Sequence, residues 1–142
     1  KMFVEKNEKF YQKGFVLNST GLIGQIFRSH SNSYELILLS DIDHKIPIYN
    51  KDFDIYCNAE GSGFERLIIC KSSKDLDKES IIGQEFYTSG FGGVFNKDMP
   101  VGKVVSFTQD EDNENEISIE IFANPLKDER VFLFQSAWVP GK

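Results

Sequence analysis

The pattern that most constrains this chain is an alternation of polar and apolar residues with a period of two. Residues 116–121 read EISIEI, so that every second side chain is apolar. Successive side chains of a strand point to opposite faces of a sheet, and this alternation is therefore typical of a strand with one buried face. Residues 101–107 (VGKVVSF) form a second such strand. The same period recurs along almost the whole chain and predicts an all-β fold.

Turn-forming residues divide the chain at short intervals, for example NSTG at 18–21, DIDH at 41–44 and NKD at 50–52. Many short strands separated by such turns predict barrels or a sandwich rather than alternating helices and strands. Helices are expected only as short steps, and residues 4–13 fit either the continuation of a helix or a first strand. The remaining strands are expected at residues 14–17, 23–28, 34–39, 46–49, 54–57, 65–71, 86–88 and 131–134, and the helical steps at 74–80 and 124–128.

The charge of the chain argues against a nucleic-acid partner. Its 142 residues include 22 acidic and 16 basic side chains, which gives a net charge of −6. The Lys and Arg residues are scattered among Glu and Asp, whereas binding to a phosphate backbone needs clustered basic side chains. The sequence also lacks an apolar run that approaches the roughly 18 residues of a membrane-spanning helix.

The two cysteines, Cys57 and Cys70, lie on either side of the sequence GSG at 61–63. If these glycines make a hairpin turn, the cysteines lie near each other on neighbouring strands, within a residue or two of register. Two outcomes fit this arrangement: a cross-strand disulfide, or two small half-buried side chains with free thiols. A register shift of one residue would point them to opposite faces, so the sequence leaves both outcomes open.

A glycine-rich segment at residues 88–105, TSGFGGVFNKDMPVGKVV, raises the question of catalysis or ligand binding. Ser89, with His44 and the nearby Asp41, supplies the residue types of a serine protease, but no spacing signature supports a triad. The glycines are not followed by a Lys-Ser pair or by a helix, so neither phosphate-binding fingerprint applies. The two histidines are separated and no Cys-x-x-Cys occurs, so no metal or cofactor is expected.

We therefore interpret this segment as a bend that carries the chain from one β-unit to another. Glycine permits a positive φ or the close passage of another strand, which a sharp bend requires. The apolar residues of the bend either pack the junction or face another protein. Aromatic residues beside turns are usually buried. The candidates for contact with a partner are Phe91, Phe95 and Met99.

Several motifs, taken in order, resemble the rod-shape-determining MreC family. Residues 88–95 (TSGFGGVF) and 100–104 (PVGKV) resemble a strand of that family that ends in T-S-G, its G-G-V-F step and its P-V-G-x-V strand. Asn96 and Gln84 depart from the family pattern, which usually has a proline and an acidic residue at these places. The other segments that match in order are KGFVL at 13–17, GLIGQI at 21–26, SYELILLSD at 33–41, FANPL at 122–126 and VFL at 131–133.

The resemblance implies two small β-barrel subdomains, one inserted between strands of the other. On this basis we expect an inserted barrel at residues 22–89 and a second barrel made of residues 1–21 plus 90–142. It also implies a periplasmic location, as the extracytoplasmic part of a bitopic inner-membrane protein. We expect a membrane anchor and a coiled coil upstream of residue 1.

The function that the resemblance implies is a non-catalytic scaffold of the bacterial cell-elongation machinery. Such a scaffold maintains rod shape by binding and organising the enzymes of peptidoglycan synthesis. The implied partners are the elongation-specific penicillin-binding transpeptidase, other membrane proteins of the rod complex and further copies of the chain itself.

Two alternatives remain beside the scaffold. One is a trypsin-like hydrolase, for which Ser89 and His44 supply the residue types, although the two-barrel arrangement of the family is similar to that of trypsin-like proteases without being catalytic. The other is a glycan-binding β-module, because exposed aromatic rings can stack on sugars. Thirteen Phe residues stand against five Tyr and one Trp, which leaves few aromatic platforms with a polar tip.

Overall fold

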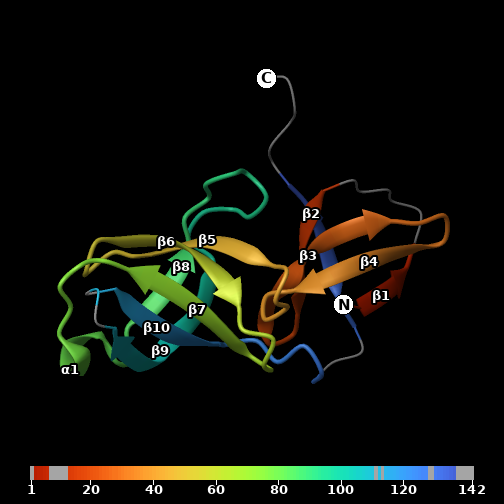
Figure 1. The fold of residues 1–142 in the computed structure, drawn as a ribbon. Coiled ribbons are helices and arrows are strands. Elements are labelled where there is room, and N and C mark those ends of the chain that lie inside the picture. The colour runs from red at the N-terminus through yellow and green to blue at the C-terminus, as the bar shows by residue number, and fades with distance from the viewer. Residues whose placement is uncertain (1, 7–12, 111, 113, 128–129, 137–142) are drawn as a thin grey trace.

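The structure, a computed structural model, describes residues 2–6, 13–110, 112, 114–127 and 130–136. Its strands form a closed six-stranded barrel beside an open five-stranded sheet (Figure 1). All of the strand pairs are antiparallel. Helix in the described residues is limited to a single turn, α1 (Lys78–Ile81). Within the same residues, no helix has the length and apolar character that crossing a bilayer requires.

The open sheet is built from the beginning and the end of the chain. Its strand order is β1-β4-β3-β2-β11, so that β1 and β11 are the two edges. The last strand returns to pair with β2, with Phe134 opposite Phe15. The five strands are β1 (Met2–Glu5), β2 (Gly14–Asn18), β3 (Gly21–Ser29), β4 (Ser33–Leu38) and β11 (Phe132–Gln135).

The barrel comes from the middle of the chain and closes in the order β10-β7-β6-β5-β8-β9. Closure leaves no strand of the barrel with an unpaired edge. Because β5 follows β4 and β10 precedes β11, the whole barrel lies between two strands of the open sheet in sequence. The six strands are β5 (Lys45–Asn50), β6 (Ile55–Gly61), β7 (Leu67–Ser72), β8 (Glu85–Thr88), β9 (Pro100–Gln109) and β10 (Asn115–Ile121).

Two apolar clusters explain how these strands pack. In β10, Ile117, Ile119 and Ile121 are buried inside the barrel, as the alternation in the sequence predicts. Consecutive residues of the open sheet belong to different clusters, because their side chains point to opposite faces. Phe15 belongs to the cluster inside the barrel, which we call the barrel cluster, whereas Val16 belongs to a second cluster on the opposite face of the sheet. The open sheet therefore lies with one face on the barrel and covers its own core with the other.

The all-β prediction is confirmed, and one predicted barrel is present as a closed ring. The other set of strands forms an open sheet, because β1 and β11 are not paired to each other in the described part of the chain. The beginning of the chain is a strand at Met2–Glu5, while residues 7–12 lie outside the described residues. Residues 124–127 form a turn rather than the expected helical step.

The prediction that the glycine-rich bend carries the chain between two β-units is wrong. Residues 89–99 connect β8 to β9, and both of these strands belong to the barrel. The sheets instead change between β4 and β5 and again between β10 and β11. The predicted limits of 22–89 for an inserted unit, and of 1–21 plus 90–142 for the other, concern folding units and stay a prediction.

Gly102 shows how closely two strands of the barrel approach. It lies opposite Ile121 in the β9–β10 pair, whose register shifts at Ser118 and Ile119. A Cβ atom on Gly102 would lie 2.3 Å from the carbonyl oxygen of Glu120. Such a contact is too short for any side chain, so the barrel needs glycine here for the space it leaves.

We predict that Gly102→Ala destabilises the barrel. The added methyl group forces β9 away from β10, and overpacking of this kind typically costs about 1–3 kcal/mol or more. The free energy of unfolding, measured in urea by circular dichroism, should fall by at least about 1 kcal/mol. The exposed neighbour Ser106 on the same strand supplies the control, since Ser106→Ala should leave stability nearly unchanged. Equal stability of the two variants would contradict this close packing of β9 on β10.

Candidate functional site

A row of aromatic side chains crosses the outside of the barrel. Phe91 stacks on Tyr56 with ring centroids 5.8 Å apart, and Tyr56 stacks on Tyr49 at 5.4 Å. Tyr87 continues the row at 6.4 Å from Tyr49. Phe91 is 63% exposed and Tyr56 is 55% exposed. We call these four residues the aromatic row.

Strand register brings three of these rings together. Tyr49 of β5 lies directly opposite Tyr56 of β6 and opposite Tyr87 of β8. The buried residues Ile48 and Asn50 on either side of Tyr49 fix it on the outer face, because side chains alternate along a strand. Cross-strand aromatic pairs of this kind stabilise a sheet and also hold its outer surface in one conformation.

Two of the three tyrosine hydroxyls in the row are held by carboxylates. Tyr49 donates a hydrogen bond to Asp98 Oδ1, and Tyr87 donates one to Glu85 Oε2 at 2.8 Å. The hydrogen bond to Asp98 is the main reason that the pKa of Tyr49 is raised to about 12. The hydrogen bond to Glu85 likewise raises the pKa of Tyr87. Tyr49 and Tyr87 therefore stay protonated at neutral pH.

The three residues expected to contact a partner occupy different environments. Phe91 points outward as the end of the aromatic row, whereas Phe95 is only 4% exposed and lies in the barrel cluster. Met99 is half-buried and packs against the same cluster. The structure therefore brings Phe91 together with Tyr56 and Tyr49, which no sequence pattern singles out.

Thr88 holds the two ends of the glycine-rich loop. Its Oγ1 accepts a hydrogen bond from the N–H of Met99 at 2.8 Å and donates one to the carbonyl oxygen of Asn96 at 2.5 Å. The backbone of Thr88 is also paired with Met99 and Asp98. Gly90, Gly92 and Gly93 all have positive φ values, between 74° and 80°. The glycines thus serve the sharp turns of a clamped loop, as their structural interpretation predicts.

The same loop contacts the open sheet through Phe95. The ring of Phe95 lies 6.3 Å from that of Phe15, which in turn stacks on Phe134 at 5.2 Å. His44, on the connection between β4 and β5, meets Phe95 edge-on at 6.1 Å. We call these four rings the junction cluster. It joins both sheets of the molecule, and the hydroxyl of Ser136 adds a hydrogen bond to the carbonyl oxygen of Val94 at 2.9 Å.

His44 is buried without a hydrogen bond from either ring nitrogen to any described residue. Burial lowers the pKa of His44 from 6.5 to about 4, and the nearby Asp41 offsets only part of this effect. The histidine is therefore neutral at physiological pH. Its environment is that of a packed ring in the junction cluster.

The structure does not assemble the triad whose residue types occur in the sequence. Ser89 is 6% exposed, and its Oγ accepts a hydrogen bond from the N–H of Phe91 at 3.3 Å. Neither ring nitrogen of His44 bonds to Ser89. A nucleophile needs a base within hydrogen-bond reach, so these two residues do not form a catalytic pair. Among the described residues, no group of His, Cys, Asp and Glu is arranged to hold a metal ion.

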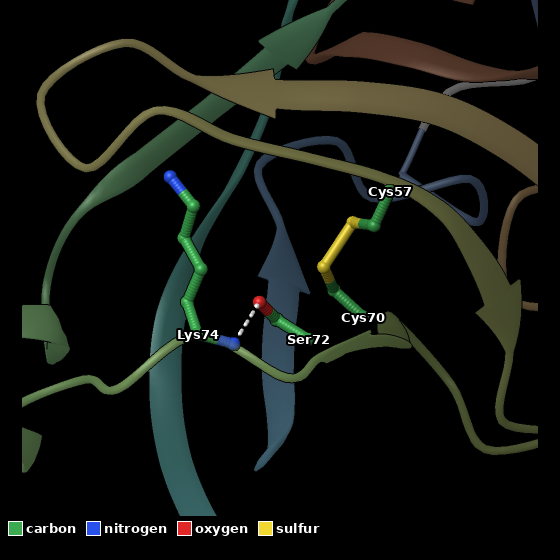
Figure 2. The surroundings of a disulfide bond; sticks show 4 residues. All are labelled: Cys57, Cys70, Ser72 and Lys74. Atoms are coloured by element: carbon green, nitrogen blue, oxygen red, sulfur yellow. Dashed lines mark hydrogen bonds between the residues drawn. A yellow bond between two sulfur atoms is a disulfide. The ribbon is translucent and has the colours of Figure 1, made fainter. Parts of the chain in front are cut away.

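Cys57 and Cys70 are joined by a disulfide that connects β6 to β7 (Figure 2). Of the two outcomes that the sequence leaves open, the structure has this one. The ladder between the two strands is short, since direct pairing is limited to Glu60 with Ile69 and Gly61 with Ile68. The disulfide links parts of the strands beyond that ladder. Cys70 is fully buried in the barrel cluster and Cys57 packs against it.

Comparison with known proteins identifies relatives by sequence. The family model described as "Rod shape-determining protein MreC, barrel core" matches residues 6–135. A curated protein, the cell shape-determining protein MreC of Haemophilus influenzae, is 33% identical over 99 residues, which cover 69% of this chain. The match covers 28% of that protein, so the chain spans much less than two thirds of its length.

Solved structures with the same fold are also found. A structure described as MreC has a TM-score of 0.78 and 23% identity, and the match covers 92% of this chain and 76% of the other. A complex between Penicillin-Binding Protein (PBP2) and MreC from Helicobacter pylori gives 0.64 and 17%, with 89% and 80% covered. A major periplasmic domain of the cell shape-determining filament MreC gives 0.61 and 22%, with 82% and 72% covered. At these identities the likeness is one of fold.

We predict that loss of the disulfide lowers stability markedly. The two cysteines are 13 residues apart, and closing a loop of this size stabilises a fold by about 3 kcal/mol. The double variant Cys57→Ser/Cys70→Ser should lose about 2–4 kcal/mol of unfolding free energy in urea. Adding a reductant should destabilise the native chain but leave the double variant unaffected. Equal midpoints with and without reductant in the native chain would contradict this role.

Acid should weaken the fold through His44. Because the pKa of His44 is lower in the folded state than its ordinary value of 6.5, the unfolded state binds a proton more readily. Its contribution to stability is complete above about pH 6.5 and is lost as the pH falls towards 4, by about 3 kcal/mol in total. His44→Phe should remove this part of the pH dependence in urea unfolding. His30→Ala, at an exposed histidine, should retain it, and the same slope in both variants would contradict the assignment.

Proposed function

This chain belongs to the rod shape-determining protein MreC family, and from that membership we propose that it acts as a non-catalytic scaffold of the bacterial cell-elongation machinery. In this role it maintains rod shape by binding and organising the enzymes of peptidoglycan synthesis. The observation that carries the proposal is the family match across residues 6–135, which takes in the barrel, the aromatic row and four of the five strands of the open sheet.

The proposed partner is the elongation-specific penicillin-binding transpeptidase. A relative with the same fold is described in a complex with a penicillin-binding protein, PBP2. The aromatic row suits a protein interface, because clustered Tyr and Phe side chains supply large contact areas at a low cost in conformational entropy. Phe91 and Tyr56 are its most exposed members and are proposed as the anchors.

Phe95 and Met99 support this surface from the inside. Phe95 fixes the loop that carries Phe91 by packing against Phe15 and His44. Met99 is held by Thr88 and packs against the barrel cluster. We propose that the partner contacts Phe91 directly, while Phe95 and Met99 keep its loop in one conformation.

We further propose that the chain is the periplasmic part of a protein anchored in the inner membrane. A related structure is described as a periplasmic domain. The Cys57–Cys70 disulfide supports this location, because structural disulfides persist in oxidising compartments such as the periplasm. Other membrane proteins of the rod complex and further copies of the chain are proposed as additional partners.

The open sheet is proposed to act as a second barrel-like unit. Side chains from both of its edges pack against one cluster, which includes Tyr34 and Leu36: Met2 and Val4 come from β1, and Leu133 comes from β11. A sheet must curl for its two edges to share one core. This supports two β-units with one inserted in the other, and we propose that their limits follow the change of sheets rather than residues 22–89.

The partner proposal predicts the effect of removing the anchors. Phe91→Ala and Tyr56→Ala should each weaken binding to the purified periplasmic part of an elongation transpeptidase at least tenfold, which is about 1.4 kcal/mol. Biolayer interferometry over micromolar concentrations measures the affinity. Leu126 is 74% exposed on a different loop, so Leu126→Ala is the matched control and should bind like the native chain. Absence of any association at high micromolar concentration, or equal losses in all three variants, would sink the proposal.

A further inference from the structure

A polar pocket of about 430 Å³ opens at the Tyr87 end of the aromatic row. This volume lies within the range of small-molecule and saccharide sites. The scaffold function assigns no role to the pocket. Its walls come from the end of β5, the turn that follows it and the start of β8. The lining residues are Asn50, Lys51, Asp52, Gly83, Gln84, Glu85 and Tyr87.

Asn50 holds the two walls in place. It is 3% exposed, and its amide nitrogen donates to Gln84 Oε1 at 3.2 Å and to the carbonyl oxygen of Glu85 at 2.9 Å. Its Oδ1 accepts a hydrogen bond from the N–H of Phe53 at 2.8 Å, which fixes the turn after β5. The pocket is therefore formed before any ligand arrives.

The groups that face the pocket can both donate and accept hydrogen bonds. Gln84 Oε1 is occupied by Asn50, so the orientation of the amide is set and its NH₂ group donates to no other described residue. Glu85 orients the hydroxyl of Tyr87 through one carboxylate oxygen. Asp52 lies close enough to Tyr87 to help raise the pKa of its hydroxyl. The ring of Tyr87 adds a half-buried aromatic wall.

This lining selects among classes of ligand. An anion is disfavoured because Asp52 and Glu85 outnumber the single cation Lys51. An apolar ligand is disfavoured because it would desolvate carboxylates and amides without replacing their hydrogen bonds. Against a cation, Lys51 offsets one of the two carboxylates, and a cation cannot accept a hydrogen bond from the NH₂ group of Gln84. Neutral hydroxyl groups can pair with carboxylate and amide together, and the C–H face of a sugar ring can pack on an aromatic wall.

We propose that this pocket binds a neutral glycan chain, with one sugar ring on Tyr87 and its hydroxyl groups bonded to Gln84, Asp52 and Glu85. The aromatic row runs on from Tyr87 to Tyr49, so an extended chain of sugars is favoured over a single one. The site goes beyond the scaffold role, because it gives the same face of the barrel a direct contact with polysaccharide.

An NMR titration of the ¹⁵N-labelled chain with the β-1,4-linked tetramer of N-acetylglucosamine tests the proposal. We expect saturable shifts of Gly83, Tyr87 and the side-chain amide of Gln84, with a dissociation constant on the order of 1 mM. Tyr87→Ala and Gln84→Ala should each weaken binding about fivefold or more, with retained dispersion of the spectrum as the check on folding. Thr108→Ala, at an exposed position on β9, is the control and should bind like the native chain.

Three results would overturn the proposal: no saturable shift at about ten times the expected dissociation constant, shifts that survive Tyr87→Ala and Gln84→Ala alike, or shifts with pentalysine in place of the sugar. The last result would identify a cationic peptide as the ligand. Transpeptidase binding measured on the same preparation separates the two claims, since failed glycan binding with intact transpeptidase binding rejects the pocket assignment alone.

Discussion

The packing of Phe95 between Phe15 and His44 is the contact on which the arrangement of this molecule depends. Phe95 belongs to the loop between two barrel strands, Phe15 to the open sheet, and His44 to the connection between the two sheets. All three are buried, so their burial contributes on the order of several kcal/mol to stability. One ring thus ties together segments that lie far apart in sequence.

Because Phe95 is buried in the junction cluster, the loop that it anchors presents Phe91 to solvent. The two residues belong to one loop, whose glycines have positive φ and whose ends are clamped by Thr88. The strands that carry the rest of the row belong to the closed barrel, and the Cys57–Cys70 disulfide links two strands of that barrel, β6 and β7. A surface that is rigid before binding loses little entropy when a partner arrives, and this is the property that a scaffold needs.

The sequence predicts the individual strands well because alternation is a local property. Residues 116–121 are recognisable for this reason, and the structure has β10 at Asn115–Ile121. The pairing of strands is not local. The role predicted for the glycine-rich segment is wrong because its sequence shows a bend but not that β8 and β9 share one barrel. Whether the five-stranded sheet stays open likewise depends on whether its edge strands β1 and β11 pair with each other, which no local pattern shows.

The candidate site is predictable only in part, and again register is the reason. Phe91 stands out because it lies among glycines, but Tyr49, Tyr56 and Tyr87 become neighbours only through cross-strand pairing. No local signal marks these tyrosines, because a single exposed aromatic residue on a strand is ordinary. The outcome for the cysteines depends on register as well, and no local pattern can decide it.

Photo-crosslinking in living cells tests the proposed contact with the transpeptidase most directly. A photoreactive phenylalanine derivative in place of Tyr56 lies in the aromatic row, and one in place of Leu126 lies on an exposed loop elsewhere. If the chain acts as the proposed scaffold, we expect a crosslink to a penicillin-binding transpeptidase from position 56 and none from position 126. A crosslink to that enzyme from position 126 alone would contradict the proposed interface.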